Sequence, residues 1–177
     1  MARILMVAAE GLPFIKSGGL ADVIGSLPNE LAKKGHEVRV IMPLYLKIAQ
    51  KFHHEFTLEA QFSVSIAYHE VPVNIWSTMR KDVKFYFVEH KGYFEREEMY
   101  GHIDDGERFA YFQKAVIEMC NQLNYFPEIM HCHDWHTGMI PAMCKEGHSF
   151  DERYRNIRFV YTLHTLANTG TFGVEIL

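Results

Sequence analysis

The sequence predicts an α/β fold built on a doubly wound parallel sheet, and three observations support this prediction. Short apolar runs alternate along the chain with longer segments whose apolar residues recur every three or four positions, as strands and helices require. Most of the short runs are continuously apolar, which is typical of strands that a parallel sheet buries on both faces. The first run, a loop, a helix and a second run also fit within about the ~30 residues of a βαβ crossover.

The first strand is expected over Arg3–Ala9, where the apolar residues follow one another without interruption. A helix is expected over Leu20–Lys34, because its apolar residues recur at helical spacing and lysines occupy its last turn. Gly35 is placed to end this helix, and Pro28 predicts that it is kinked or restarted. Glu37–Met42 then predicts the second strand of the unit.

The middle of the chain has a different residue pattern. Apolar and polar residues partly alternate over 56–67 and 71–79, where β-branched residues are frequent, and an apolar strand is expected over 84–89. We interpret it as a β-hairpin inserted beside the main sheet. The remaining elements expected are a helix over 107–123, a strand over 127–132, a short helix over 136–145 and a last strand over 158–163.

Composition excludes several classes of protein. The 177 residues carry 18 Lys and Arg against 22 Asp and Glu, a net charge of −4, so nucleic acid is a poor candidate partner. The longest apolar run, Ile4–Ala9, is far shorter than the ~18 to 20 residues of a membrane helix, so no membrane partner is expected. The N-terminus lacks the features of a signal or transit peptide, and the three unpaired cysteines suit reduced thiols, so we expect a cytoplasmic protein.

Ligands of doubly wound folds bind beyond the carboxyl ends of the strands, which directs attention to three loops. The first runs from Glu10 to Asp22. Gly18 and Gly19 would let backbone approach a ligand closely, the following helix N-terminus offers free N–H groups, and Lys16 adds a cation. These features suit a diphosphate or a sugar that bears one. The alternative is an ordinary turn with a solvated lysine, in which Asp22 only stabilises the helix.

The second loop holds three histidines and an aspartate within His131–His136. This density resembles a metal site, but the aspartate stands at position 134, one residue away from where a known zinc hydrolase pattern has it. Strand alternation also puts only His131 and His133 on one face. The other interpretation is that Asp134 and the histidines bind sugar hydroxyls, or that Asp134 caps a helix that begins at Trp135.

The third loop, Thr162–Phe172, begins with a histidine at the end of a strand and is rich in hydroxyl and amide side chains. His164 can offer a ring nitrogen or its carbonyl oxygen to a polyol substrate. A histidine bonded within its own loop is the alternative.

Three motifs resemble, in order and spacing, the N-terminal domain of bacterial glycogen synthase and plant starch synthase. They are Glu10-x-x-Pro-Phe-x-Lys-Ser-Gly-Gly-Leu-Ala-Asp-Val23, Val40-Ile-Met-Pro-Leu-Tyr45 and His131-Cys-His-Asp-Trp-His136. The resemblance covers Met1 to about Gly173. It implies a retaining glucosyltransferase that moves glucose from ADP-glucose, the donor, to the non-reducing end of an α-1,4-glucan such as glycogen, the acceptor, without a bound metal or other cofactor.

The same resemblance implies a GT-B fold, in which two Rossmann-like domains face each other across a cleft. The first domain holds mainly the glucan and the second mainly the nucleotide. Residues 1–177 would then be an incomplete N-terminal catalytic domain without its C-terminal nucleotide-binding partner, and inactive alone. Two alternatives are a non-catalytic α-glucan-binding module and a metallohydrolase built on His131, His133 and His136.

Roles carry over by position in the motifs. Lys16 matches the lysine that contacts ADP-glucose, Gly18 and Gly19 match the glycines that approach its phosphate, and Asp22 matches an aspartate of the active site.

Two further catalytic positions come from the other loops. Asp134 matches the aspartate near the acceptor, and His164 matches the histidine whose carbonyl and ring lie near the transferred glucose. Two places in this loop depart from the family pattern. Thr165 stands where the family normally has asparagine, and Asn168-Thr169 stand where Tyr-Gln is common. These departures leave the sugar contacts of this loop open.

Overall fold

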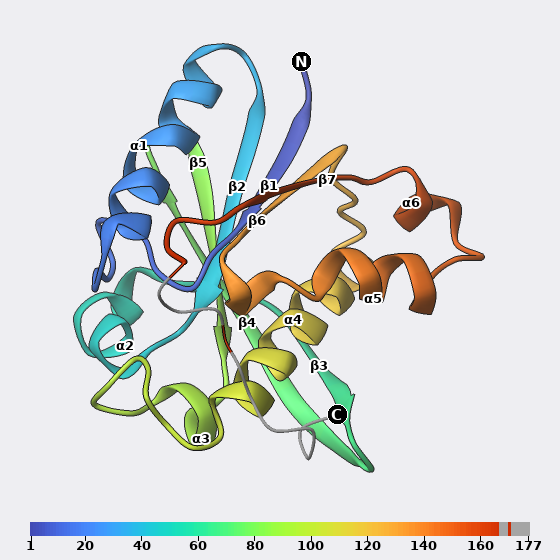
Figure 1. Ribbon diagram of the computed structural model, residues 1–177. Helices are drawn as coiled ribbons and strands as arrows, with labels where there is room; N and C mark the ends of the chain where they lie inside the picture. Colours follow the sequence, from blue (N-terminus) through green and yellow to red (C-terminus); the bar gives the residue numbers. More distant parts are fainter. Residues whose placement is uncertain (167–169, 171–177) are drawn as a thin grey trace.

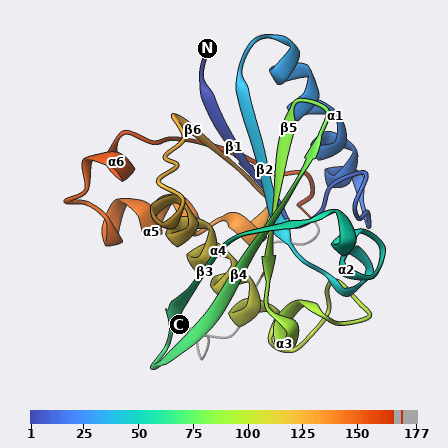
Figure 2. The same cartoon turned by 180° about the vertical axis from the view of Figure 1, so that it is seen from behind.

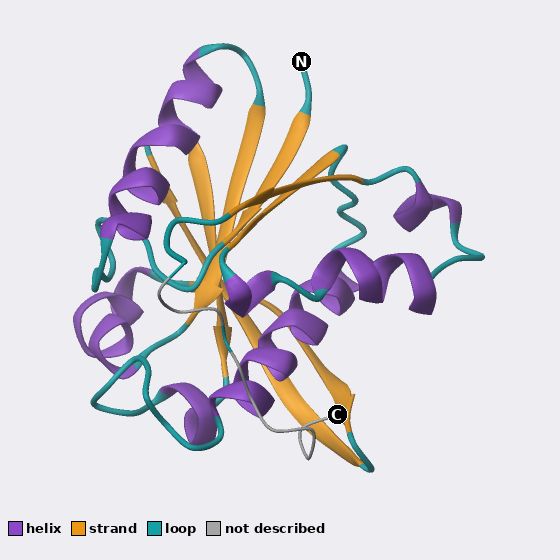
Figure 3. Ribbon diagram, viewed as in Figure 1, coloured by secondary structure: helices purple, strands orange, loops and turns teal. Residues whose placement is uncertain are grey.

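The computed structural model describes residues 1–166 and 170 and contains a seven-stranded sheet flanked by helices (Figures 1 and 3). The order of the strands across the sheet is β3-β4-β5-β2-β1-β6-β7. The strands are β1 (Arg3–Val7), β2 (Glu37–Pro43), β3 (Thr57–Ile66), β4 (His69–Arg80), β5 (Val83–Glu89), β6 (Ile129–His133) and β7 (Arg158–Thr162). The predicted α/β class with a parallel sheet is confirmed.

Helices cover both faces of this sheet: α1 lies on one side, and α4 and α5 lie on the other (Figures 1 and 2). The α-helices are α1 (Gly19–Lys33), α2 (Leu46–Phe52), α3 (Lys91–Phe94), α4 (Asp105–Gln122), α5 (Ile140–Gly147) and α6 (Glu152–Arg155). Two short 3-10 helices, η1 (His53–Glu55) and η2 (Trp135–Thr137), complete the described elements.

The strands β5, β2, β1, β6 and β7 run parallel, so their carboxyl ends meet along one edge. In the register, Val7 of β1 lies opposite Cys132 of β6, and Cys132 lies opposite Tyr161 of β7. The loops that follow β1, β6 and β7 therefore start from the same row of the sheet. We call this row the carboxyl edge.

The core forms because β1 is apolar on both of its faces. Leu5, Met6 and Val7 have no solvent-exposed surface, and α1 presents Leu20 and Ile24 to the sheet. Burying an aliphatic side chain of this size stabilises a fold by about 1.5–3 kcal/mol. This packing fixes the strand and the helix between which the first loop is held.

The inserted hairpin is confirmed, and the structure shows how it joins the sheet. β3 pairs antiparallel with β4, β4 pairs antiparallel with β5, and β5 pairs parallel with β2. The hairpin is thus a continuation of the main sheet at one edge, and its tip extends well beyond the neighbouring strands (Figure 2).

Two details of the helices differ from expectation. α1 continues through Pro28 as one helix, so of the two alternatives, a kink or a restart, the restart is wrong. Gly35 follows the end of α1 with a φ of +86°, which confirms its place at the end of the helix. The helix expected over 136–145 is instead η2 followed by α5, which begins at Ile140 with Pro141 in its first turn. Proline is favoured in that turn because its missing N–H would have had no partner.

Candidate active site

The first loop of the carboxyl edge is held by a buried carboxylate, that of Glu10. Its oxygens accept hydrogen bonds from the backbone N–H groups of Ser17 and Gly18, the latter at 3.1 Å. Glu10 is only 3% exposed, so these bonds replace most of its lost contact with water. One N–H group of the glycine pair is therefore used to shape the loop, a role that sequence reasoning did not assign to Glu10 although it stands in the motif.

Lys16 and Asp22 bind each other at the mouth of this loop. The Lys16 ammonium nitrogen lies 2.7 Å from both carboxylate oxygens of Asp22, which sits in the first turn of α1. Both side chains are about half exposed, at 47% and 54%. Exposed ion pairs contribute only about 0–1 kcal/mol, so an anionic ligand can displace Asp22 from Lys16 at low cost.

Gly19 begins α1 and has open space beside it. A Cβ atom added there would meet no other atom within 4 Å, whereas one at Gly18 would lie 3.5 Å from a Glu10 oxygen. Gly18 stands at the N-cap position, and because glycine has no side chain it cannot accept hydrogen bonds from the first-turn N–H groups of α1. The start of α1 thus keeps backbone donors and the positive end of the helix dipole next to Lys16.

Close packing positions this loop against α1. A Cβ at Gly11 would lie 2.4 Å from Cγ2 of Ile24, and one at Gly25 would lie 2.8 Å from Cβ of Leu12. Such distances leave no room for a side chain, so the glycines at 11 and 25 let the loop and the helix touch.

Asp134 connects the second and third loops. Its Oδ1 accepts a hydrogen bond from the backbone N–H of His164 at 2.7 Å, and its own N–H donates to the carbonyl of Thr162. The expectation that its side chain caps the helical turn at Trp135 is wrong: Asp134 precedes η2, but its side chain makes no capping bond. The competing bond to the neighbouring loop explains this.

Three histidines gather beside Asp134. The rings of His131 and His133 lie 4.0 Å apart, which confirms that they share a face of β6. Nε2 of His131 lies 2.8 Å from Oγ1 of Thr162, and Nδ1 of His133 lies 2.9 Å from Nε2 of His164. Burial, helped by the other two histidines, lowers the pKa of His133 to about 3, so its ring is neutral at pH 7.

His136 points into a different neighbourhood, between the rings of Tyr100 and Phe109. Burial and the charge of Arg108 lower its pKa to about 3. The Arg108 side chain is fully buried, and its Nη1 donates to Asp105 at 2.9 Å and to the carbonyl of Met99. A buried arginine beside the histidine loop was not foreseen, because a single arginine in a helical pattern indicates an exposed face.

The histidines do not assemble a metal site in the part of the chain that the structure describes. Within residues 1–166 and 170, no group of three His, Cys, Asp or Glu side chains is arranged to hold a metal ion. The ring nitrogens of His131 and His133 instead bind Thr162 and His164. Over the same residues, no helix combines the length and the apolarity needed to cross a membrane.

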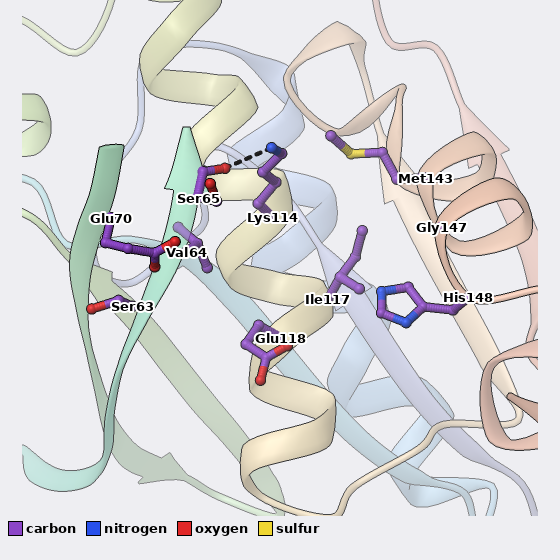
Figure 4. Close-up of a pocket in the computed structure, with 10 residues that line it drawn as sticks. All are labelled: Ser63, Val64, Ser65, Glu70, Lys114, Ile117, Glu118, Met143, Gly147 and His148. Atoms are coloured by element: carbon purple, nitrogen blue, oxygen red, sulfur yellow. Dashed lines mark hydrogen bonds between the residues drawn. The ribbon is translucent and has the colours of Figure 1, made fainter. Parts of the chain in front are cut away.

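A cavity of about 660 Å³ lies away from these loops, between the β3–β4 hairpin and the helices α4 and α5 (Figure 4). Lys114 extends from α4 toward the hairpin and donates to the carbonyl of Ser65 at 2.6 Å (Figure 4). The residues that line it include none of those placed at the carboxyl edge.

The fold and this edge define a Rossmann-like α/β domain, with its polar loops gathered at the carboxyl ends of parallel strands. Residues 3–177 match the family model of the starch synthase catalytic domain, and the chain belongs to that family. The chain is 45% identical over 175 residues to the glycogen synthase of Streptococcus agalactiae and 43% identical to that of Clostridium kluyveri. Each match covers 99% of this chain and 37% of the relative's length.

A solved structure gives the same result. The catalytic domain of starch synthase IV from Arabidopsis thaliana, bound to ADP and acarbose, superposes with a TM-score of 0.82 at 26% identity, over 99% of this chain and 38% of that one. The family resemblance drawn from the motifs is therefore confirmed. Neither the α-glucan-binding module nor the metallohydrolase gains support from these comparisons.

Of the residues that depart from the family pattern in the third loop, Thr165 is within the described residues, whereas Asn168-Thr169 lie outside them.

Proposed function

We propose that this chain supplies the acceptor-side half of a retaining glucosyltransferase that moves glucose from ADP-glucose to the non-reducing end of an α-1,4-glucan. The observation that carries the proposal is the exposed Lys16–Asp22 pair at the start of α1, set on the same carboxyl edge as Asp134 and His164. The curated relatives are glycogen synthases, and the solved relative holds ADP and acarbose, which supports a nucleotide-sugar donor and a glucan acceptor.

The charges that develop during glucose transfer define a role for each polar group of the first loop. When the donor's bond breaks, negative charge grows on the departing diphosphate and positive charge on the sugar ring. Lys16 and the N–H groups at the start of α1 meet the diphosphate, and preformed donors of this kind stabilise a transition state strongly. Gly19 leaves space for the phosphate to approach, and Gly18 holds the loop through its bond to Glu10.

Asp22 holds the Lys16 ammonium at the start of α1 through the two 2.7 Å contacts until the diphosphate takes its place. The remaining polar groups serve the sugars. Asp134 keeps the His164 backbone in place, so the His164 ring and carbonyl are held where the transferred glucose lies, with the acceptor beside them. The resemblance requires no protein nucleophile and no metal.

A chimeric enzyme tests this function. The matching segment of the Streptococcus agalactiae glycogen synthase, 37% of that protein, is replaced by residues 1–177. We expect the chimera to incorporate radiolabelled glucose from ADP-glucose into glycogen, in linkages that an exo-acting α-1,4-glucanase releases. The parent enzyme is the positive control. A folded chimera that transfers no glucose while the parent is active contradicts the proposal.

A further inference from the structure

His133 and His164 form a hydrogen-bonded pair of imidazole rings where β6 and β7 end. Nδ1 of His133 lies 2.9 Å from Nε2 of His164, although the residues are 31 positions apart in the chain. His133 is fully buried, whereas His164 is partly exposed. The question is which of the two nitrogens carries the shared proton.

A neutral imidazole has one N–H donor and one lone pair, so the pair has two possible arrangements. In the first, Nδ1–H of His133 donates to Nε2 of His164. In the second, Nε2–H of His164 donates to Nδ1 of His133, and the proton of His133 moves to its own Nε2. Both arrangements place one hydrogen bond between the same two nitrogens. The surroundings of the other ring nitrogens therefore decide between them.

The environment of His133 Nε2 favours the first arrangement. This atom is buried and has no hydrogen-bond partner among the described residues. In the second arrangement it would be an N–H donor without an acceptor, and such buried orphan donors are rarer in proteins than orphan acceptors. In the first it is only an unused lone pair. Because His131 packs against this ring at 4.0 Å, a charged His133 is also disfavoured.

We propose that His133 is a positioning residue that holds His164 in the Nδ1–H tautomer. Since Nε2 of His164 accepts the proton of His133, the proton of His164 must sit on Nδ1. His164 then offers an N–H donor, not a lone pair, from Nδ1. That the donor serves a hydroxyl of the transferred sugar rests on the proposed function; the tautomer itself does not.

Nitrogen NMR of the chain tests the tautomer directly. Long-range proton–nitrogen spectra of protein labelled in its histidine rings distinguish protonated from unprotonated ring nitrogens, and a His164→Gln variant assigns the signals. We expect Nδ1 of His164 to be protonated and Nε2 to be unprotonated at pH 7. A protonated Nε2 on His164 in the wild-type chain overturns the proposal without any variant.

Two substitutions at position 133 sharpen the test. His133→Phe fills the space without a donor, and we expect the His164 proton to move to Nε2. His133→Asn places a side-chain amide near the former Nδ1, and we expect it to restore the Nδ1–H tautomer. His69→Phe, at an exposed residue of β4, is the control and should change nothing. An Nδ1–H tautomer that persists in a folded His133→Phe variant contradicts the proposal.

The chimera separates this proposal from the proposed function. There, we expect His133→Phe to lower kcat about tenfold, the cost of one hydrogen bond in the transition state, and His133→Asn to recover most of it. If the wild-type chimera is inactive but the NMR tautomer is as expected, the function fails and the positioning role stands. If the tautomer is wrong, the positioning role fails whatever the chimera does.

Discussion

Oδ1 of Asp134 lies 2.7 Å from the backbone nitrogen of His164, and this hydrogen bond joins the loop after β6 to the loop after β7. Asp134 has a φ of +57° and a ψ of 178°, a backbone conformation that residues other than glycine rarely adopt. Such a conformation costs about 1–3 kcal/mol and persists only where surrounding bonds hold it. Here the bonds to His164 and Thr162 hold it.

Replacing Asp134 should therefore weaken the fold as well as the site. We expect Asp134→Ala to lower the free energy of unfolding by about 1–3 kcal/mol, because the partly buried N–H of His164 loses its acceptor. Asp134→Asn keeps an acceptor oxygen and should cost less. Urea denaturation of the chain measures both. Asp82→Ala, in the exposed turn after β4, is the control, and an Asp134→Ala variant as stable as that control contradicts the account.

The stability of the chain should depend on pH through His133 and His136. Burial lowers the pKa of each to about 3, while each titrates near 6.5 in the unfolded chain. Between these values the unfolded state binds more protons, so stability is complete above pH 6.5 and is lost as the pH falls below it. Each histidine contributes a slope of at most about 1.4 kcal/mol per pH unit.

Urea denaturation at pH 7, 6 and 5 measures this slope. His136→Asn removes one of the two groups, so we expect a shallower decline between pH 6 and 5 than in the wild type. His69→Asn, at an exposed position, should leave the decline as it is. A His136→Asn variant with an unchanged slope shows that its burial does not control the acid sensitivity.

The first loop should be intolerant of a methyl group at Gly11. Its Cβ would lie 2.4 Å from Ile24, so loop and helix must move apart. We expect Gly11→Ala to destabilise the chain by about 1–3 kcal/mol, as overpacking does. Gly147→Ala is the matched control, because a Cβ there meets no atom within 4 Å. Equal melting temperatures for the two variants contradict the packing argument.

The strands and long helices could be predicted because their signals are local. After Arg3, β1 is apolar because a parallel sheet buries it on both faces, and α4 carries a continuous buried stripe that includes Phe109, Phe112 and Val116. The helices α2, α3 and α6 were not predicted. They have seven, four and four residues, too few for periodicity to show, and such short helices depend on tertiary packing.

The site was predicted as three loops but not as a set of contacts. The rule that ligands bind at the carboxyl ends of parallel strands identified the loops, and the register confirms that they start from one row. The pairing of His133 with His164 and the bond from Asp134 depend on two strands becoming neighbours, which no local pattern encodes. For the same reason one of the alternatives considered for Asp134 was a cap of η2, its nearest helical turn in sequence.

The central claim is that the start of α1 and Lys16 receive the donor's diphosphate. The most direct measurement is kcat/KM for ADP-glucose in the glycogen synthase chimera with Lys16→Ala, compared with Lys33→Ala. Lys33 also forms an exposed ion pair on α1, with Glu30 at 2.6 Å, but at the opposite end of the helix. We predict a loss of about 10²-fold for Lys16→Ala and none for Lys33→Ala; equal rates for the two variants would contradict the account.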